Sequence, residues 1–532
     1  MSGGIQGPFP NVLLLSALIA FVPLLWLLIS LGLLKMKAYT ASLISLILAI
    51  TLSIIAWGMP VKYAFQSVVE GAVTGLWPIV WVIIAAIYTY NVTVETGSMN
   101  IIKETLAKIS PDRRIQALIL AFSFGGFLEA AAGFGTAVAI PASLLAGIGF
   151  DPLFAAIICL IANTVPVAFG GIGIPIITLS QVTGISESLI TKYAAYQLIP
   201  FIIILPIVLV IIMTKSFKNL KEVLGACLVS GVSFAIFQTL VAVFVGPEVA
   251  AIAGSLASLL SIIIYVKLRP VKNIWLFLHE KANSEIAPTK EAKNVDNKIS
   301  ERKQLIAWTP YIILFILIMA INLIPWLKFL GNIATKVQIY FGPGGKQSSL
   351  QWITTPGTIM FISAIVGGIL QGDGVKELIV TFFKTIKQLM PTILVVTSIV
   401  AMAKVMGYSG MISVIAIALA HMTGKVYPFI SPLIGALGTF ITGSDTSSNI
   451  LFGPLQKQTA LQIHVNSAWI AAANTVGASA GKMISPQSIA VAASATGLVG
   501  KEGRILNSTL IYCIGYAILL GIVVFTFGYY IV

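Results

Sequence analysis

The chain has 532 residues, of which 58% are hydrophobic and only 9% are charged. A soluble domain carries roughly a quarter charged residues because its surface faces water, so a soluble fold is excluded and lipid must cover much of this surface. The net charge of +14 would suggest nucleic-acid binding in a soluble protein, but in a membrane protein basic residues mark the cytoplasmic loops, and we predict no nucleic-acid partner.

Long stretches without charge alternate with short basic loops along the chain. A helix needs roughly 20 apolar residues to cross a bilayer, and the continuously apolar stretch 200–214 (PFIIILPIVLVIIMT) excludes the alternating pattern of a barrel strand. We therefore predict an all-α polytopic membrane protein with about 12 transmembrane helices. The predicted spans are 12–34, 38–57, 77–97, 152–176, 196–214, 222–245, 249–267, 306–327, 355–371, 390–407, 466–488 and 508–531.

Positive charge predicts the orientation of these spans. Basic residues follow the first span at Lys35 and Lys37, and other clusters recur along the chain. If all of these face the cytoplasm, two segments, about 115–148 and 427–457, must each enter and leave on one side. We predict that both are re-entrant hairpins and that both termini lie outside. The loop 328–346 carries three lysines and would also lie outside, as an exception to the rule.

The two halves of the chain match each other in sequence. Pro78 and Pro141 correspond to Pro391 and Pro454 at a constant separation of 313 residues, and a two-residue slip then aligns ANTV at 162–165 with ANTV at 473–476. Matching spans run in opposite directions, so we predict an inverted-topology repeat with its substrate site at mid-membrane. The predicted domains are an N-terminal half at 1–266, a cytoplasmic polar linker at 267–305, and a C-terminal half at 306–532.

The apolar pattern breaks at matching places in the two halves. One pair of breaks, 129–136 and 442–449, falls in the predicted hairpins, where glycine and serine suit a tight turn. The other pair, 163–166 and 474–477, predicts broken helices within 152–176 and 466–488, because Pro166 lacks a donor and Gly477 weakens a helix. Half-helix N-termini suit a small carboxylate, so the predicted substrate is an organic anion.

The polar residues at these breaks are the candidate site. Ionisable groups are costly inside a membrane and are functional candidates by default. Glu129 or Asp445 could carry a coupling proton, since burial disfavours the charged form, and Lys404 or Lys482 could neutralise the substrate. The predicted substrate-binding residues are Gly133, Phe134, Gly135, Thr136, Asn163, Thr164, Ser444, Thr446, Ser447, Ser448, Asn449, Asn474 and Thr475.

Simpler structural roles remain open for several of these positions. The small residues at 477–481 (GASAG) could only let helices pack closely. Glu129 could pair with a lysine, and Asn163 and Asn474 could only cap helix ends. Nucleotide-binding and HExxH motifs are absent from the sequence, and no metal-binding cysteine pair exists. We therefore expect no enzyme activity and no cofactor, and transport driven by an ion gradient.

The segments 125–175 (GGFLEAAAGFGTAVAIPASLLAGIGFDPLFAAIICLIANTVPVAFGGIGIP), 77–97 (WPIVWVIIAAIYTYNVTVETG) and 443–453 (GSDTSSNILFG) resemble the L-lactate permease family. The resemblance extends over nearly the whole chain. It implies proton-coupled uptake of L-lactate, and of relatives such as glycolate, across a bacterial cytoplasmic membrane. Side chains such as Thr136, Ser444 or Asn449 would then read the 2-hydroxyl. A wider likeness to hairpin-containing carboxylate transporters implies an elevator-like movement, and a homo-oligomer is left open.

Three alternatives remain at this point. A sodium-coupled carboxylate symporter is the nearest, since broken helices and polar loops such as GSDTSSN also offer oxygens to Na⁺. A membrane-embedded enzyme acting on a lipid would need paired acids or histidine clusters, and the chain has only three histidines. A channel is the third, and saturable uptake against a gradient would exclude it.

Overall fold

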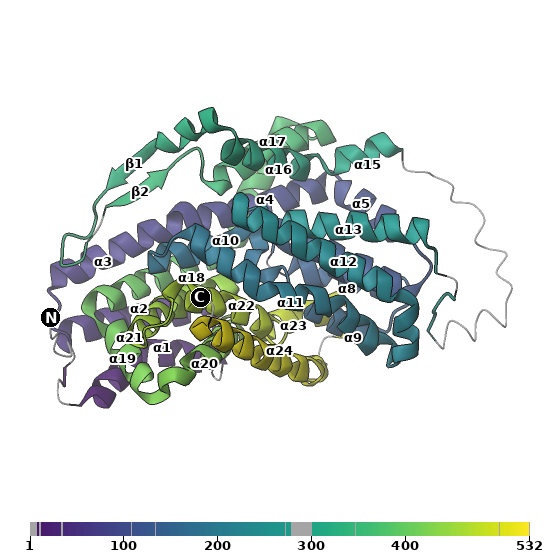
Figure 1. Ribbon diagram of the computed structural model, residues 1–532. Coiled ribbons are helices and arrows are strands. Elements are labelled where there is room, and N and C mark those ends of the chain that lie inside the picture. The colour runs from purple at the N-terminus through teal and green to yellow at the C-terminus, as the bar shows by residue number, and fades with distance from the viewer. Residues whose placement is uncertain are drawn as a thin grey trace.

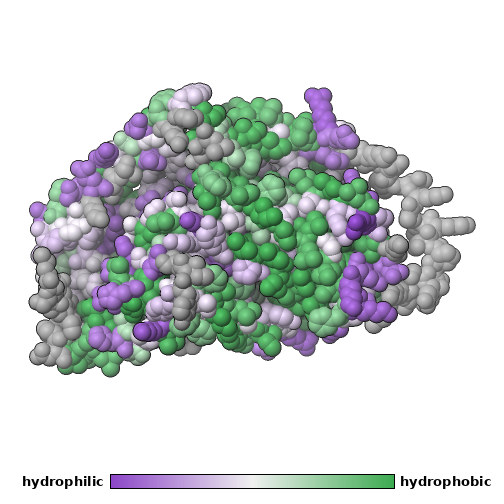
Figure 2. Space-filling model, viewed as in Figure 1, coloured by the Kyte–Doolittle hydropathy of each residue, from purple (hydrophilic) through white to green (hydrophobic). Residues whose placement is uncertain are grey.

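The computed structural model describes residues 8–530 except 10, 11, 33, 35, 108, 134, 272, 278–299, 346, 499 and 500. Within this part of the chain, ten helices are long and apolar enough to cross a membrane, or twelve if two sharply bent helix pairs each count as one span. The prediction of a polytopic helical membrane protein is therefore confirmed (Figure 1). In Figure 2, apolar side chains cover the middle of the visible face and hydrophilic ones gather toward its ends, as lipid contact requires.

The first half of the chain ends in two long helices, α12 and α13, which pack against each other. Short stretches of π-helix and 3₁₀-helix interrupt the α-helices that precede them. The elements are α1 (Leu13–Gly32), α2 (Ala38–Ile55), α3 (Val61–Thr74), η1 (Gly75–Val80), α4 (Trp81–Glu95), α5 (Ser98–Ala107), α6 (Arg113–Ala117), η2 (Leu118–Phe124), α7 (Gly125–Ala131), α8 (Thr136–Gly147), α9 (Pro152–Ala162), η3 (Val167–Phe169), α10 (Gly170–Thr183), α11 (Glu187–Thr214), α12 (Phe217–Phe244) and α13 (Ala250–Leu268).

The second half contains the only departure from an all-α fold in the described residues. Strands β1 and β2 form an antiparallel pair with Ala334 opposite Gln351. The elements are α15 (Glu301–Ala307), α16 (Thr309–Leu323), η4 (Pro325–Asn332), β1 (Ala334–Val337), β2 (Ser348–Gln351), α17 (Pro356–Gln371), α18 (Val375–Ser409), α19 (Met411–Thr423), η5 (Gly424–Val426), α20 (Tyr427–Thr442), α21 (Asp445–Gln462), α22 (Ser467–Lys482), α23 (Pro486–Ala495) and α24 (Glu502–Tyr530).

The elements α16–α24 follow the same order as α1–α11. Helices of each half pack against helices of the other half in matching pairs, as a two-fold repeat requires. Helix α8 packs against α23, while α21, the mate of α8, packs against α10. In the same way, α9 packs against α24 and its mate α22 packs against α11. The long helices before the hairpins both have 35 residues, Val61–Glu95 and Val375–Ser409. These pairings agree with the predicted repeat, whereas the domain boundaries stay a prediction because 278–299 lie outside the described residues.

Both segments predicted as hairpins form helix–turn–helix units, and their re-entrance from one side of the membrane stays a prediction. The first turn lies between Ala131, the end of α7, and Thr136, the start of α8, and the second lies at 443–444 between α20 and α21. Gly133 and Gly443 have φ of 63° and 75°, a conformation that glycine adopts without the cost of a Cβ clash. The glycines therefore place both turns where the sequence pattern predicted them.

Of the two predicted helix breaks, one lies where expected and the other is displaced. Helix α9 ends at Ala162, and the chain bends by 63° before α10. The predicted break at 474–477 is wrong, because α22 continues to Lys482 and the chain turns at 483–485 before Pro486 begins α23. Gly477 does not interrupt the helix, since its missing Cβ instead makes room for the backbone of α20.

Close packing is what the glycines of α22 provide. A Cβ on Gly477 would overlap the carbonyl oxygen of Pro432, and one on Gly481 would overlap that of Ala436. We expect Gly477→Ala to destabilise the protein by about 1–3 kcal/mol, the usual effect of overpacking, and to lower its melting temperature in detergent. Gly515→Ala is the control, because nothing lies within 4 Å of that Cβ position. Equal melting temperatures for both variants would contradict this packing.

Candidate functional site

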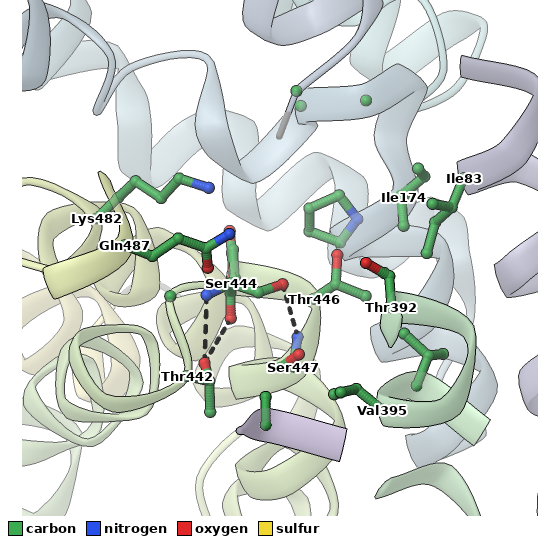
Figure 3. Close-up of a pocket in the computed structure, with 18 of the residues that line it drawn as sticks. Ile83, Ile174, Thr392, Val395, Thr442, Ser444, Thr446, Ser447, Lys482 and Gln487 are labelled. Atoms are coloured by element: carbon green, nitrogen blue, oxygen red, sulfur yellow. Dashed lines mark hydrogen bonds between the residues drawn. The ribbon is translucent and has the colours of Figure 1, made fainter. Parts of the chain in front are cut away.

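The tips of the two hairpins meet at a cavity of about 390 Å³. Elements α2, α4, η3, α10, α18, α22 and α23 supply its other walls, and polar side chains gather on the side of the second hairpin (Figure 3). The residues that line the cavity are Lys37, Ala38, Tyr39, Ile83, Glu129, Gly133, Val167, Gly170, Gly171, Ile174, Pro175, Pro391, Thr392, Val395, Val396, Thr442, Gly443, Ser444, Asp445, Thr446, Ser447, Lys482 and Gln487.

Three helices begin at this cavity. The regular part of α10 starts at Ile174, after three left-handed residues, and α21 and α23 start at Asp445 and Pro486. Ser444 caps α21, with its hydroxyl accepting from the Ser447 N–H at 3.3 Å. The first turn of a helix carries N–H groups without intrahelical partners and a partial positive charge. The convergence of three such turns suits a small anion such as a carboxylate.

Two buried acids and one buried lysine line the same cavity, and the second lysine of the lining, Lys37, is exposed. Glu129 and Asp445 are each 3% exposed and Lys482 is 8% exposed. The Lys482 ammonium interacts electrostatically with both carboxylates, and in Figure 3 its amine extends toward the cavity. With all three groups ionised, their charges sum to −1. A bound monocarboxylate would raise this buried negative charge further unless a cation entered with it.

A buried chain of hydrogen bonds holds Asp445 from behind. The Thr475 hydroxyl donates to both oxygens of Asp445 at 3.2 and 3.1 Å, and the Asn449 amide donates to Thr475 at 2.9 Å. The Asn474 amide donates to the Asn449 oxygen at 2.9 Å. Gln456 in turn donates to the Asn474 oxygen at 3.0 Å. The polar residues of the second repeat thus form one connected network that ends on the Asp445 carboxylate.

The structure brings seven of the predicted site residues to the cavity and leaves others behind its wall. Those that line it are Glu129, Gly133, Ser444, Asp445, Thr446, Ser447 and Lys482. Asn163, Thr164, Ser448, Asn449, Asn474 and Thr475 are buried outside the lining. Gly135 is also outside it and faces Val491. Phe134 and the side chain of Thr136 lie outside the described residues, so the prediction that they bind substrate stays a prediction.

Lys404 lies elsewhere than predicted. Its ammonium is 2.7 Å from Oε1 of the buried Glu70, which also accepts from the Tyr408 hydroxyl at 2.8 Å. Lys404 is absent from the cavity lining, so this lysine neutralises Glu70 rather than facing the substrate space. Glu70 was not predicted, because it follows Lys62 by only eight residues, outside the charge-free stretches, and the sequence does not reveal a partner 334 residues away.

Several lining residues were also missed by sequence reasoning. Gln487 and Thr392 face the cavity from α23 and α18, and Thr442 stands at the second hairpin tip. Thr392 directly follows Pro391, which matches Pro78 in the repeat, and Gln487 directly follows Pro486, which matches Pro175 at the same separation as the ANTV tetrads. The matched prolines could therefore have indicated these two residues, because the chain next to each of these prolines lies at the cavity.

The comparisons with known proteins agree over the full length of the chain. The family model for L-lactate permease matches residues 16–532. An L-lactate permease of Streptococcus iniae is 43% identical over 458 residues, which are 86% of this chain and 93% of that one. The glycolate permease GlcA of Escherichia coli (strain K12) is 38% identical, covering 96% of this chain and 95% of the other. An L-lactate permease of Bacillus subtilis (strain 168) is 38% identical, with 97% of each chain covered.

The fold also has a solved counterpart. Neisseria gonorrhoeae MtrF, described within a class of antimetabolite efflux pumps, superposes with a TM-score of 0.53 over 95% of this chain and 97% of its own. At 13% identity this likeness concerns the fold alone. The named relatives are permeases rather than enzymes, and the apolar helices make the chain a multi-pass membrane protein. The chain belongs to the L-lactate permease family.

Proposed function

We propose that the chain is a symporter that carries L-lactate, and short relatives such as glycolate, together with a proton across the bacterial cytoplasmic membrane. The observation that carries the proposal is the cavity at the hairpin tips, where three helix N-termini and Lys482 face two buried carboxylates. The membership of the L-lactate permease family and the relatives named as lactate and glycolate permeases give the substrate class.

The charge of the three buried groups in the cavity supports coupling to a monovalent cation, which we propose is a proton. Glu129, Asp445 and Lys482 together carry −1 when all are ionised, and lactate brings the sum to −2. One proton returns the sum to −1, the same as for these three buried groups without lactate. The loaded and empty carriers then cross the membrane with equal charge, and no unpaired anion is moved through a low-dielectric region.

The exposed Lys37 at the cavity supports an orientation. Lys37 is one of the basic residues that the charge rule assigns to the cytoplasm, and it lines the cavity next to Tyr39. We infer that this conformation is open toward the cytoplasm and that both chain termini lie outside.

The test is uptake of labelled L-lactate into proteoliposomes with an imposed inward proton gradient and no sodium. We expect concentrative uptake that a protonophore abolishes and unlabelled glycolate inhibits, with protein-free liposomes as control. Uptake that requires sodium and ignores the proton gradient would overturn the proposal in favour of a sodium-coupled carboxylate symporter. No uptake under either gradient would remove lactate as the substrate.

A further inference from the structure

The two asparagines of the matched ANTV tetrads, Asn163 and Asn474, have opposite surroundings. Asn474 is fully buried, donates to Asn449 and accepts from Gln456. Asn163 is 2% exposed, yet neither polar atom of its carboxamide has a hydrogen-bond partner among the described residues. Burial of an amide without hydrogen-bond partners costs free energy. The Asn163 carboxamide therefore points to a neighbouring group with which it forms a hydrogen bond at another stage of the transport cycle.

The group beside Asn163 is Glu129. The Glu129 carboxylate lies next to the Asn163 carboxamide without a well-aligned hydrogen bond, and its Oε2 atom has no partner among the described residues. The other oxygen, Oε1, faces Gly170 and Gly133 at the cavity wall. A carboxamide can donate its N–H to an ionised carboxylate or accept from a protonated one. Asn163 can therefore serve Glu129 in either protonation state.

Asp445 differs from Glu129 in this respect. The Thr475 hydroxyl oxygen accepts a hydrogen bond from the Asn449 amide. Its own single proton is donated to the Asp445 carboxylate. Burial of Asp445 disfavours its ionised form, and the donation from Thr475, with Lys482 nearby, acts against this effect. The second repeat thus gives its carboxylate an aligned hydroxyl donor, whereas the first repeat places only the poorly aligned Asn163 carboxamide beside its carboxylate.

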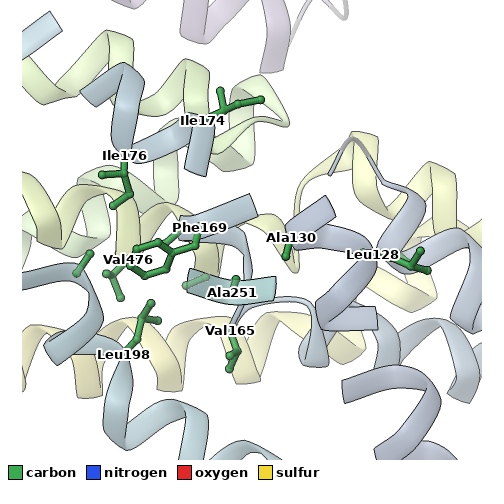
Figure 4. Packing of buried hydrophobic residues seen from close by; sticks show 14 of the residues in the cluster. Leu128, Ala130, Val165, Phe169, Ile174, Ile176, Leu198, Ala251 and Val476 are labelled. Carbon is green, nitrogen blue, oxygen red and sulfur yellow. The ribbon is translucent and has the colours of Figure 1, made fainter. Parts of the chain in front are cut away.

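Resting on the proposed function, we infer that Glu129 carries the coupling proton, with Asn163 as its positioning partner, and that Asp445 remains ionised. Leu128, Val165 and Phe169, which lie on the chain segments that carry this pair, are buried apolar side chains (Figure 4). The charged groups that act on Glu129 are Lys482 and Asp445. Of the elements packed against α7, the helices α8, α10, η2 and η3 carry no titratable side chain, α9 carries Cys159, and α13 carries Tyr265 and Lys267.

The first test compares Glu129→Gln with Asp445→Asn in proteoliposomes. Lactate exchange at equal pH on both sides needs no net proton movement, whereas accumulation does. We expect Glu129→Gln to lose accumulation driven by a proton gradient but to keep exchange, and the exchange rate to become independent of pH. Asp445→Asn should weaken exchange while keeping the wild-type midpoint of the pH profile. Accumulation by Glu129→Gln, or pH-independent exchange by Asp445→Asn alone, would overturn the inference.

The second test needs no change at Glu129 itself. Asn163→Leu removes an amide that stabilises an ionised neighbour more than a neutral one, since charge-assisted hydrogen bonds are the stronger. We expect the pH midpoint of lactate exchange to move upward by about 0.5–1 unit, the equivalent of one hydrogen bond. An unchanged midpoint would contradict the role of Asn163. If wild-type protein shows no proton-driven uptake, the proposed function fails instead, so the two failures are distinguishable.

Discussion

Replacement of Lys482 by methionine is expected to weaken L-lactate uptake by about 10- to 100-fold, chiefly through a higher KM. A hydrogen bond to a charged group contributes roughly 1.5–3 kcal/mol, and each 1.4 kcal/mol corresponds to about a tenfold change in affinity. Lys482 is the last residue of α22 and lines the cavity. It is the buried lysine of that lining, so it can form an ion pair with a substrate carboxylate there. The measurement is initial uptake into proteoliposomes over a range of lactate concentrations.

Lys404→Met is the matched control for this prediction. Lys404 is also an intramembrane lysine, but its partner is Glu70 and it does not line the cavity. Its loss should lower stability by leaving Glu70 unpaired, while the KM of the folded fraction stays near the wild-type value. A normal KM for Lys482→Met, or an equal increase in both variants, would contradict the role given to Lys482.

Arg114→Met is expected to destabilise the protein by about 3–5 kcal/mol, the usual effect of breaking a buried ion pair. Arg114 is fully buried and lies 2.7 Å from Asp112 and 2.9 Å from Glu222. Its guanidinium also donates to the carbonyl oxygens of Asn219 and Asn273 at 2.7 and 2.8 Å. These contacts fix the entry of the first hairpin to α12 and to the segment after α13. The measurement is the yield and melting temperature of purified protein.

Lys384→Met serves as the control for Arg114. Lys384 and Glu95 form an ion pair at 3.0 Å, but their side chains are 62% and 41% exposed, and exposed pairs contribute only about 0–1 kcal/mol. We therefore expect its melting temperature to stay close to the wild-type value. A similar loss of stability in both variants would show that the Arg114 contacts are not the anchor of the first hairpin.

The sequence allowed the helical membrane fold and both hairpin turns to be predicted, because each depends on local chemistry. Charge-free stretches follow from the cost of charge in lipid, and the turns follow from glycines such as Gly133 and Gly443 that adopt positive φ. The second helix break was misplaced because glycine has two uses in a helix. Gly477 supports close packing against α20, and only the neighbouring helix reveals which use applies.

The site could be predicted as a set of residues but not as a network. Asn163 and Asn474 look equivalent in sequence, yet their surroundings differ because the repeat position of Gln456 is Ser143 in the first half. Arg114 reads as one more cytoplasmic charge, although the fold buries it between two acids. Contacts between residues hundreds of positions apart, such as Lys404 with Glu70, depend on helix packing that periodicity does not specify.

The most direct test of the central claim is protection of a single introduced thiol at Thr446 by substrate. Thr446 lines the cavity and is partly exposed, and the three native cysteines are buried, so Thr446→Cys would supply the reactive group. We predict that L-lactate slows its modification by a small thiol reagent saturably, while an exposed control thiol from Gly503→Cys reacts at a rate that lactate does not change. Modification of Thr446→Cys at one rate with and without saturating lactate would contradict a substrate site at the hairpin tips.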